Sequence, residues 1–121
     1  MTQRDAILNV AGCELARKNP QIFATTVEEY CTVLQLAVEE AVSGTDRHTF
    51  ARVRTLARKL GELDCVPQDL IVVHLSALAT VVKNKPHEMA KACVWHSRLL
   101  LVKIIGELAL FYREQARAEG R

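Results

Sequence analysis

Two histidines are the residues in this sequence best suited to chemistry. His48 follows Arg47 in a polar stretch, whereas His74 interrupts the apolar run "LIVVHLSAL" of residues 70–78. A histidine can transfer protons, bind a metal ion or accept a phosphoryl group. In apolar surroundings it is more often a packed group whose ring nitrogens are hydrogen-bonded. We therefore expect His74 to be a core or interface residue.

No pattern indicates a catalytic or metal centre. The histidines include no HExxH motif and no pair four residues apart, and Cys13, Cys31, Cys65 and Cys93 form no CxxC pair. The chain also lacks a glycine-rich phosphate loop, a Ser-His-Asp order and paired carboxylates in an apolar setting. We expect a protein that is not an enzyme, with no catalytic residues, no metal and no cofactor.

Phosphoryl transfer is the alternative chemistry. Histidine phosphotransfer domains are helical and carry a histidine shortly before a Lys-Gly pair on an exposed helix face. His48 and His74 resemble only the histidine half of that motif, because no Lys-Gly pair follows either residue. His48 is predicted to lie in a basic turn, where Arg47 and Arg52 would stabilise a phosphoryl group. A phosphotransfer domain with His48 as its acceptor remains the alternative function.

Length, charge and cysteine usage narrow the class of protein. The chain has 121 residues, enough for one domain, and a net charge of +2 that does not favour nucleic acid as a partner. The start of the chain does not resemble a signal peptide. The most apolar run, residues 99–105, contains Lys103 and is too short to span a membrane. We expect reduced cysteines and a cytoplasmic protein without membrane contact.

Four breaks divide the chain into segments that all show the helical period. The breaks lie at Asn19-Pro20, Ser43-Gly44-Thr45, residues 64–67 and Asn84-Lys85-Pro86. The predicted helices cover about 3–18, 26–43, 46–62, 67–82 and 86–118. Thr26 and Glu29 have the spacing of a capping box. The prediction is an all-α, four-helix bundle-like domain with an extra N-terminal helix and a long C-terminal helix.

The predicted last helix is apolar around most of its circumference. One broad side contains Cys93, Ile104, Ile105 and Leu108, which are expected to face the core. A second strip contains Trp95, Leu99, Val102, Gly106 and Leu110. A helix that is apolar on nearly all sides must be covered on nearly all sides. We expect a second copy of the chain or a partner to cover this strip; the alternative cover is the helix predicted at 3–18.

Two stretches carry a resemblance to a known family. Residues 65–78 ("CVPQDLIVVHLSAL") and 106–115 ("GELALFYREQ") resemble parts of the amino-terminal partner-binding domain of RsbU-type stress-response phosphatases. The carboxy-terminal domain of the KaiA-type clock proteins has the same architecture, and which of the two is the closer relative stays open. The resemblance divides the chain into residues 1–23, an extra helix and linker, and residues 24–121, the KaiA/RsbU-like helical domain.

The resemblance implies a regulatory function without chemistry. Such a domain forms a homodimer and docks a signalling protein, which is a switch kinase or a clock ATPase, in stress-response or circadian-type signalling. Together with the apolar strip, it gives a predicted partner or dimer interface. The residues of this interface are His74, Trp95, Leu99, Val102, Gly106, Leu110 and Tyr112.

Overall fold

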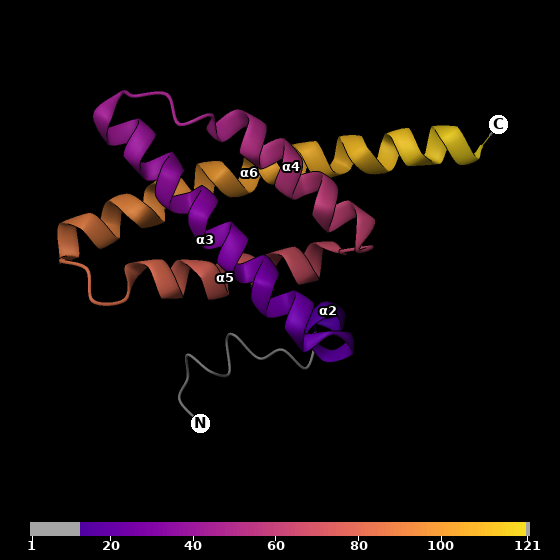
Figure 1. The fold of residues 1–121 in the computed structure, drawn as a ribbon, viewed down its shortest axis with the longest axis horizontal. Helices are drawn as coiled ribbons and strands as arrows, with labels where there is room; N and C mark the ends of the chain where they lie inside the picture. Colours follow the sequence, from indigo (N-terminus) through magenta and orange to yellow (C-terminus); the bar gives the residue numbers. More distant parts are fainter. Residues whose placement is uncertain (1–12, 121) are drawn as a thin grey trace.

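The computed structural model describes residues 13–120, which form helices and no strand. The helices are α2 (Glu14–Lys18), α3 (Pro20–Ser43), α4 (Thr49–Glu62), α5 (Pro67–Val82) and α6 (His87–Glu119). Figure 1 shows α3 crossing both α5 and α6, with α4 alongside α6. The all-α class predicted from the sequence is confirmed for this part of the chain.

The start of α3 differs from the prediction. The helix begins at Pro20, and the Asn19 side chain accepts a hydrogen bond from the Ile22 amide at 3.1 Å. Proline suits a first helical position because its missing N–H would have no partner there. Thr26 is therefore an interior residue, whose hydroxyl donates to the Ile22 carbonyl at 2.7 Å. The predicted Thr26–Glu29 capping box is wrong, and the expected linker up to residue 23 is helical from Pro20.

Only part of the first predicted helix can be compared with the structure. Residues 1–12 lie outside the described residues, and the remainder of that prediction corresponds to α2. This short helix packs against α3 and α5. Leu15 and Ala16 are its buried residues. The described part of the N-terminal segment therefore contributes to the core on the side of α3 and α5.

Asp69 joins the starts of two helices. One of its carboxylate oxygens accepts from the Val66 amide at 3.2 Å, and the other accepts from the Glu14 amide at 3.0 Å. Amides in the first turn of a helix have no partner within the helix, so a carboxylate there stabilises the helix end. The buried Asp69 side chain thus caps α5, which begins at Pro67 as predicted, and holds α2 against it.

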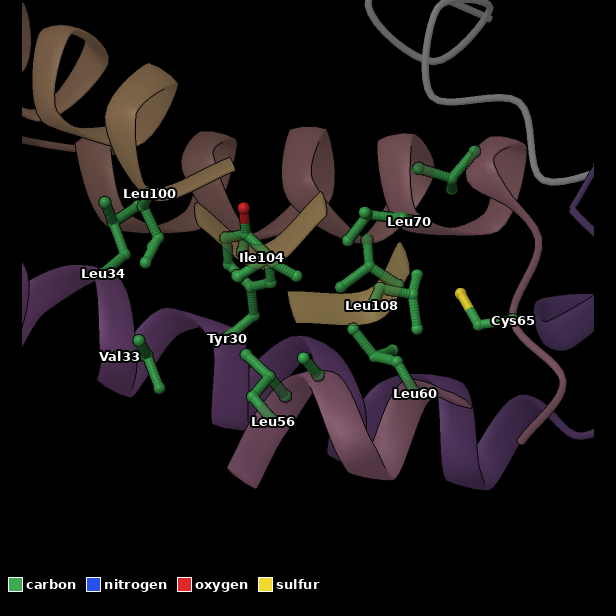
Figure 2. Close-up of a cluster of buried hydrophobic side chains, with 14 of the residues drawn as sticks. Tyr30, Val33, Leu34, Leu56, Leu60, Cys65, Leu70, Leu100, Ile104 and Leu108 are labelled. Carbon is green, nitrogen blue, oxygen red and sulfur yellow. The ribbon is translucent and has the colours of Figure 1, made fainter. Parts of the chain in front are cut away.

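The core lies where α3, α4, α5 and α6 meet. Figure 2 shows aliphatic side chains from these helices pointing toward one another, with Cys65 at one end of the cluster. Its labelled members are Tyr30, Val33, Leu34, Leu56, Leu60, Cys65, Leu70, Leu100, Ile104 and Leu108. Packing of this kind leaves α6 with one side in the core and the opposite side free of the other four helices.

Contacts between α4 and α6 fix how α6 lies on the fold. Arg54 pairs with Glu107 at 3.7 Å, and the Arg58 guanidinium lies 6.0 Å from the centre of the Phe111 ring. Both contacts join residues 53 positions apart, so the two helices run in the same direction here. α6 is about 50 Å long at 1.5 Å per residue. Its last turns extend beyond the other helices (Figure 1).

Candidate docking surface on helix α6

The predicted apolar strip faces solvent. We call Trp95, Leu99, Val102, Gly106 and Leu110 the α6 strip. The four larger side chains have exposed fractions between 44% and 68%, with Val102 the most exposed. Spacings of three and four residues place all five on one side of the helix. The strip is a continuous apolar surface that the other described helices leave open.

Ile105 belongs to this surface rather than to the core. The sequence predicted it on the core-facing side, together with Cys93, Ile104 and Leu108. Those three residues are buried as predicted, whereas Ile105 is about half exposed. It lies at the edge of the buried side, one turn of the helix from Val102. The prediction for Ile105 is wrong, and the apolar surface is wider than the strip alone.

Gly106 has no packing role within the described fold. A Cβ atom at this position would meet nothing within 4 Å. Glycine in a helix interior destabilises the helix by about 1 kcal/mol relative to alanine. At Gly61, in contrast, a Cβ would meet the Phe111 ring at 2.3 Å, so internal packing requires that glycine. No contact within the described fold explains why α6 has a glycine at position 106, despite the loss of helix stability. A glycine there would let the backbone of a second chain approach α6 closely.

Cations flank the strip. Between residues 88 and 114, α6 carries the cations Lys91, Arg98, Lys103 and Arg113 and the acidic residues Glu88, Glu107 and Glu114. All four cations are exposed, and within residues 13–120 no ion pair joins them to a carboxylate. Glu107 is paired with Arg54. Exposed Glu88 and Glu114 lie beyond the two ends of the strip, so the rim of unpaired positive charge is formed along its sides by Arg98 and Lys103. The apolar pattern of the sequence did not predict this rim.

A hollow lies beside Leu99, where α6 meets the α3–α4 corner. Its volume is about 270 Å³, and its lining residues are Ala37, Glu40, Ala41, Thr49, His96, Leu99, Leu100 and Lys103. Glu40 accepts hydrogen bonds from the Arg47 amide at 2.8 Å and the Thr49 hydroxyl at 3.1 Å. Its carboxylate thus holds the corner together, and the hollow offers space for a large side chain next to the strip.

His74 is a core residue and does not belong to the surface. Its side chain is only 6% exposed, and its Nδ1 lies 2.7 Å from the Tyr30 hydroxyl oxygen in a hydrogen bond. The two rings meet edge to face, with centroids 5.6 Å apart. Burial lowers the pKa of His74 and raises that of Tyr30. The sequence left two roles open for His74, and in the structure it is a core residue.

Tyr112 is also used within the chain. Its hydroxyl donates to the Cys65 carbonyl at 2.6 Å, which ties the end of α6 to the loop between α4 and α5. Burial raises the pKa of the Tyr112 hydroxyl. Its ring packs against the core cluster and edge-on to Phe111. The predicted interface role of Tyr112 is not supported by this position, because the side chain is turned toward the α4–α5 loop.

His48 precedes α4 and does not lie on a helix face. It occupies the N-cap position with a φ of 57°, in the left-handed region. Its exposed ring has its Nδ1 3.8 Å from an Asp46 carboxylate oxygen, and the Arg47 guanidinium lies 3.9 Å from Glu39. These acidic neighbours would repel a phosphoryl group, so the structure adds no support for His48 as its acceptor.

Half of the cations on α4 form ion pairs. Arg54 pairs with Glu107, Lys59 forms a short contact with Glu29, and Arg58 lies near the Phe111 ring. This arrangement gives no continuous row of free cations for a nucleic acid backbone. Arg52 and Arg58 form no ion pair with a described carboxylate, so unpaired cations lie on α4 as well as on α6.

The cysteines are free thiols in the described structure. Burial raises the pKa of Cys65 to about 12, with a further contribution from Asp69, and also raises the pKa values of Cys13 and Cys31. A thiol rather than a thiolate is a weak nucleophile and a weak metal ligand. Within residues 13–120, no group of three or more His, Cys, Asp or Glu side chains is arranged to hold a metal ion.

No helix in the described part of the chain is both long and apolar enough to cross a membrane.

Comparison with known proteins gives no relative. No family model, no curated protein and no solved structure matches this chain.

Proposed function

We propose that this chain is a non-catalytic regulatory module that acts by binding other protein chains through the α6 strip. Following the sequence resemblance, the proposal includes a bundle-like domain that forms a homodimer and docks a signalling partner such as a switch kinase. His74 and Tyr112 are left out of the proposed interface because both are engaged within the chain.

The observation that carries the proposal is the exposed apolar surface of α6. Scattered apolar residues are normal on protein surfaces, but a contiguous apolar patch with a polar rim is typical of an interaction site. Here Trp95, Leu99, Val102 and Leu110 follow one another along a rigid helix, with Ile105 beside them. The unexplained Gly106 in the middle of the strip supports the same conclusion.

Trp95 gives a direct test, because it is the only tryptophan of the chain and lies on the strip. We expect Trp95 emission to shift to shorter wavelength when another chain covers the strip. With rising protein concentration, this shift should accompany a change in solution mass from 13.5 kDa to twice that value. Val102→Asp should abolish both changes, because it places a charge at the centre of the apolar contact.

His48→Gln serves as the control. It should leave the self-association and the emission of Trp95 unchanged, whereas it would abolish phosphoryl acceptance in a phosphotransfer domain. A chain that accepts phosphoryl groups only when His48 is present would contradict the proposal. A Val102→Asp variant that self-associates like the wild type would show that the strip is not the contact surface.

A further inference from the structure

The charges around the strip allow its partner to be described more closely. This inference rests on the proposed function and concerns the chemistry of the docked chain. From their spacing on α6, Arg98 and Lys103 flank the strip on its two sides, whereas Lys91 and Arg113 lie in line with its two ends. All four are exposed and free of ion pairs to described carboxylates. Exposed Glu88 and Glu114 offset the charges at the two ends, so a docked chain meets apolar contacts with positive charge along both sides, from Arg98 and Lys103.

A second copy of this chain fits that surface less well than an acidic partner does, so the homodimer of the proposed function is the weaker of the two associations. Two identical strips in contact bring Arg98 and Lys103 of both copies together, whereas Glu107 is already paired with Arg54, and the exposed Glu88 and Glu114 lie beyond the two ends of the strip rather than along its sides. Like charges at the edge of an interface weaken association and disfavour the wrong partner. Acidic side chains on the partner would instead pair with Arg98 and Lys103 at the rim of the contact.

The shape of the surface favours a helix as the docked element. The strip from Trp95 to Leu110 extends over about 22 Å, which equals about four turns of a helix. Its members recur at the spacing of helical anchors, and the helix-in-groove mode of recognition uses anchors of that spacing. Gly106 lets a second backbone come close, and the hollow beside Leu99 offers space for one large anchor side chain.

We propose that the α6 strip binds an acidic amphipathic helix of a partner protein, in preference to a second copy of this chain. The apolar face of that helix covers Trp95, Leu99 and Val102, and its backbone passes over Gly106. Its Glu or Asp side chains pair with Arg98 and Lys103.

Two synthetic helical peptides test this proposal. Both carry the same leucine stripe and no tryptophan, but one has glutamate and the other lysine at the remaining positions. Binding to the full chain is followed by the emission of Trp95. We expect the glutamate peptide to bind at least about tenfold more tightly than the lysine peptide at low salt. Its affinity should fall as salt is added, because the rim contacts are exposed to solvent.

Variants of the chain distinguish the contribution of the charged residues to peptide binding from that of the apolar contact. Arg98→Glu combined with Lys103→Glu should reverse the preference, so that the lysine peptide becomes the tighter ligand. Arg52→Glu is the matched control, because Arg52 is exposed in a hollow between α3 and α4 and does not lie on α6. It should leave the preference unchanged. Circular dichroism of each variant shows whether its helices are retained.

The outcomes distinguish this inference from the proposed function. Equal binding of both peptides would overturn the acidic preference but leave the strip as a docking surface. A stable dimer that binds neither peptide would overturn the inference and support self-association instead. A monomer that binds neither peptide, with no shift of Trp95 emission, would contradict both. Preferential binding of the glutamate peptide, reversed by the double variant, supports both.

Discussion

At the scale of single residues, a hydrogen bond in the core joins the His74 ring to the Tyr30 hydroxyl. An apolar setting was enough to favour a packed histidine, and that expectation agrees with the structure. Its partner lies 44 positions earlier in the chain, so local spacing could not identify it. The same holds for Tyr112, which bonds to the Cys65 carbonyl from 47 positions away. The sequence left open whether His74 packs in the core or at an interface, and its burial in the structure places it in the core.

The lowered pKa of His74 predicts how stability depends on pH. Burial disfavours the charged ring, so the folded state holds a proton less tightly than the unfolded state, whose histidine pKa is about 6.5. The free energy of unfolding should therefore be highest above pH 6.5 and should fall as the pH decreases below that value. Urea unfolding at several pH values measures this change. His74→Gln should show a shallower fall, and an equally steep fall in that variant would assign the effect to other groups.

At the scale of helices, boundaries marked by proline and glycine were the most predictable features. Pro67 begins α5, and α3 ends before Gly44, whose φ of 73° suits a residue without a Cβ. The start of α3 was missed because the Thr26–Glu29 spacing was given more weight than Asn19-Pro20. An asparagine cap followed by proline is the stronger signal, and an interior threonine can bond to the carbonyl four residues earlier.

The two helix glycines predict opposite effects of the same substitution. Gly106→Ala should raise the free energy of unfolding by about 0.5–1 kcal/mol, because alanine favours the helix and its methyl group meets nothing. Gly61→Ala should lower it by about 1–3 kcal/mol, because the new methyl group would collide with the Phe111 ring. Chemical denaturation measures both. A destabilising effect of Gly106→Ala would reveal an internal contact at the strip and weaken its assignment as a docking surface.

At the scale of the whole molecule, the exposed side of α6 follows from a simple limit on packing. Four shorter helices can bury only one side of a helix about 50 Å long. The opposite side of α6 stays uncovered, although its residues are also apolar. The sequence therefore predicted the strip itself. It did not predict that Ile105 widens this surface or that the cations around it lack partners, because both depend on contacts between residues far apart in the sequence.

The rim of cations predicts the sign of the salt dependence of each kind of association. When two copies meet through the α6 strip, their like-charged rims repel, so added salt should strengthen self-association by screening that repulsion. An acidic helix is attracted by the same rim, so added salt should weaken its binding. Solution mass and Trp95 emission, measured between about 50 mM and 500 mM salt, follow both processes. Self-association that weakens with salt would mean that the copies pair opposite charges, which would contradict repulsion between the two rims.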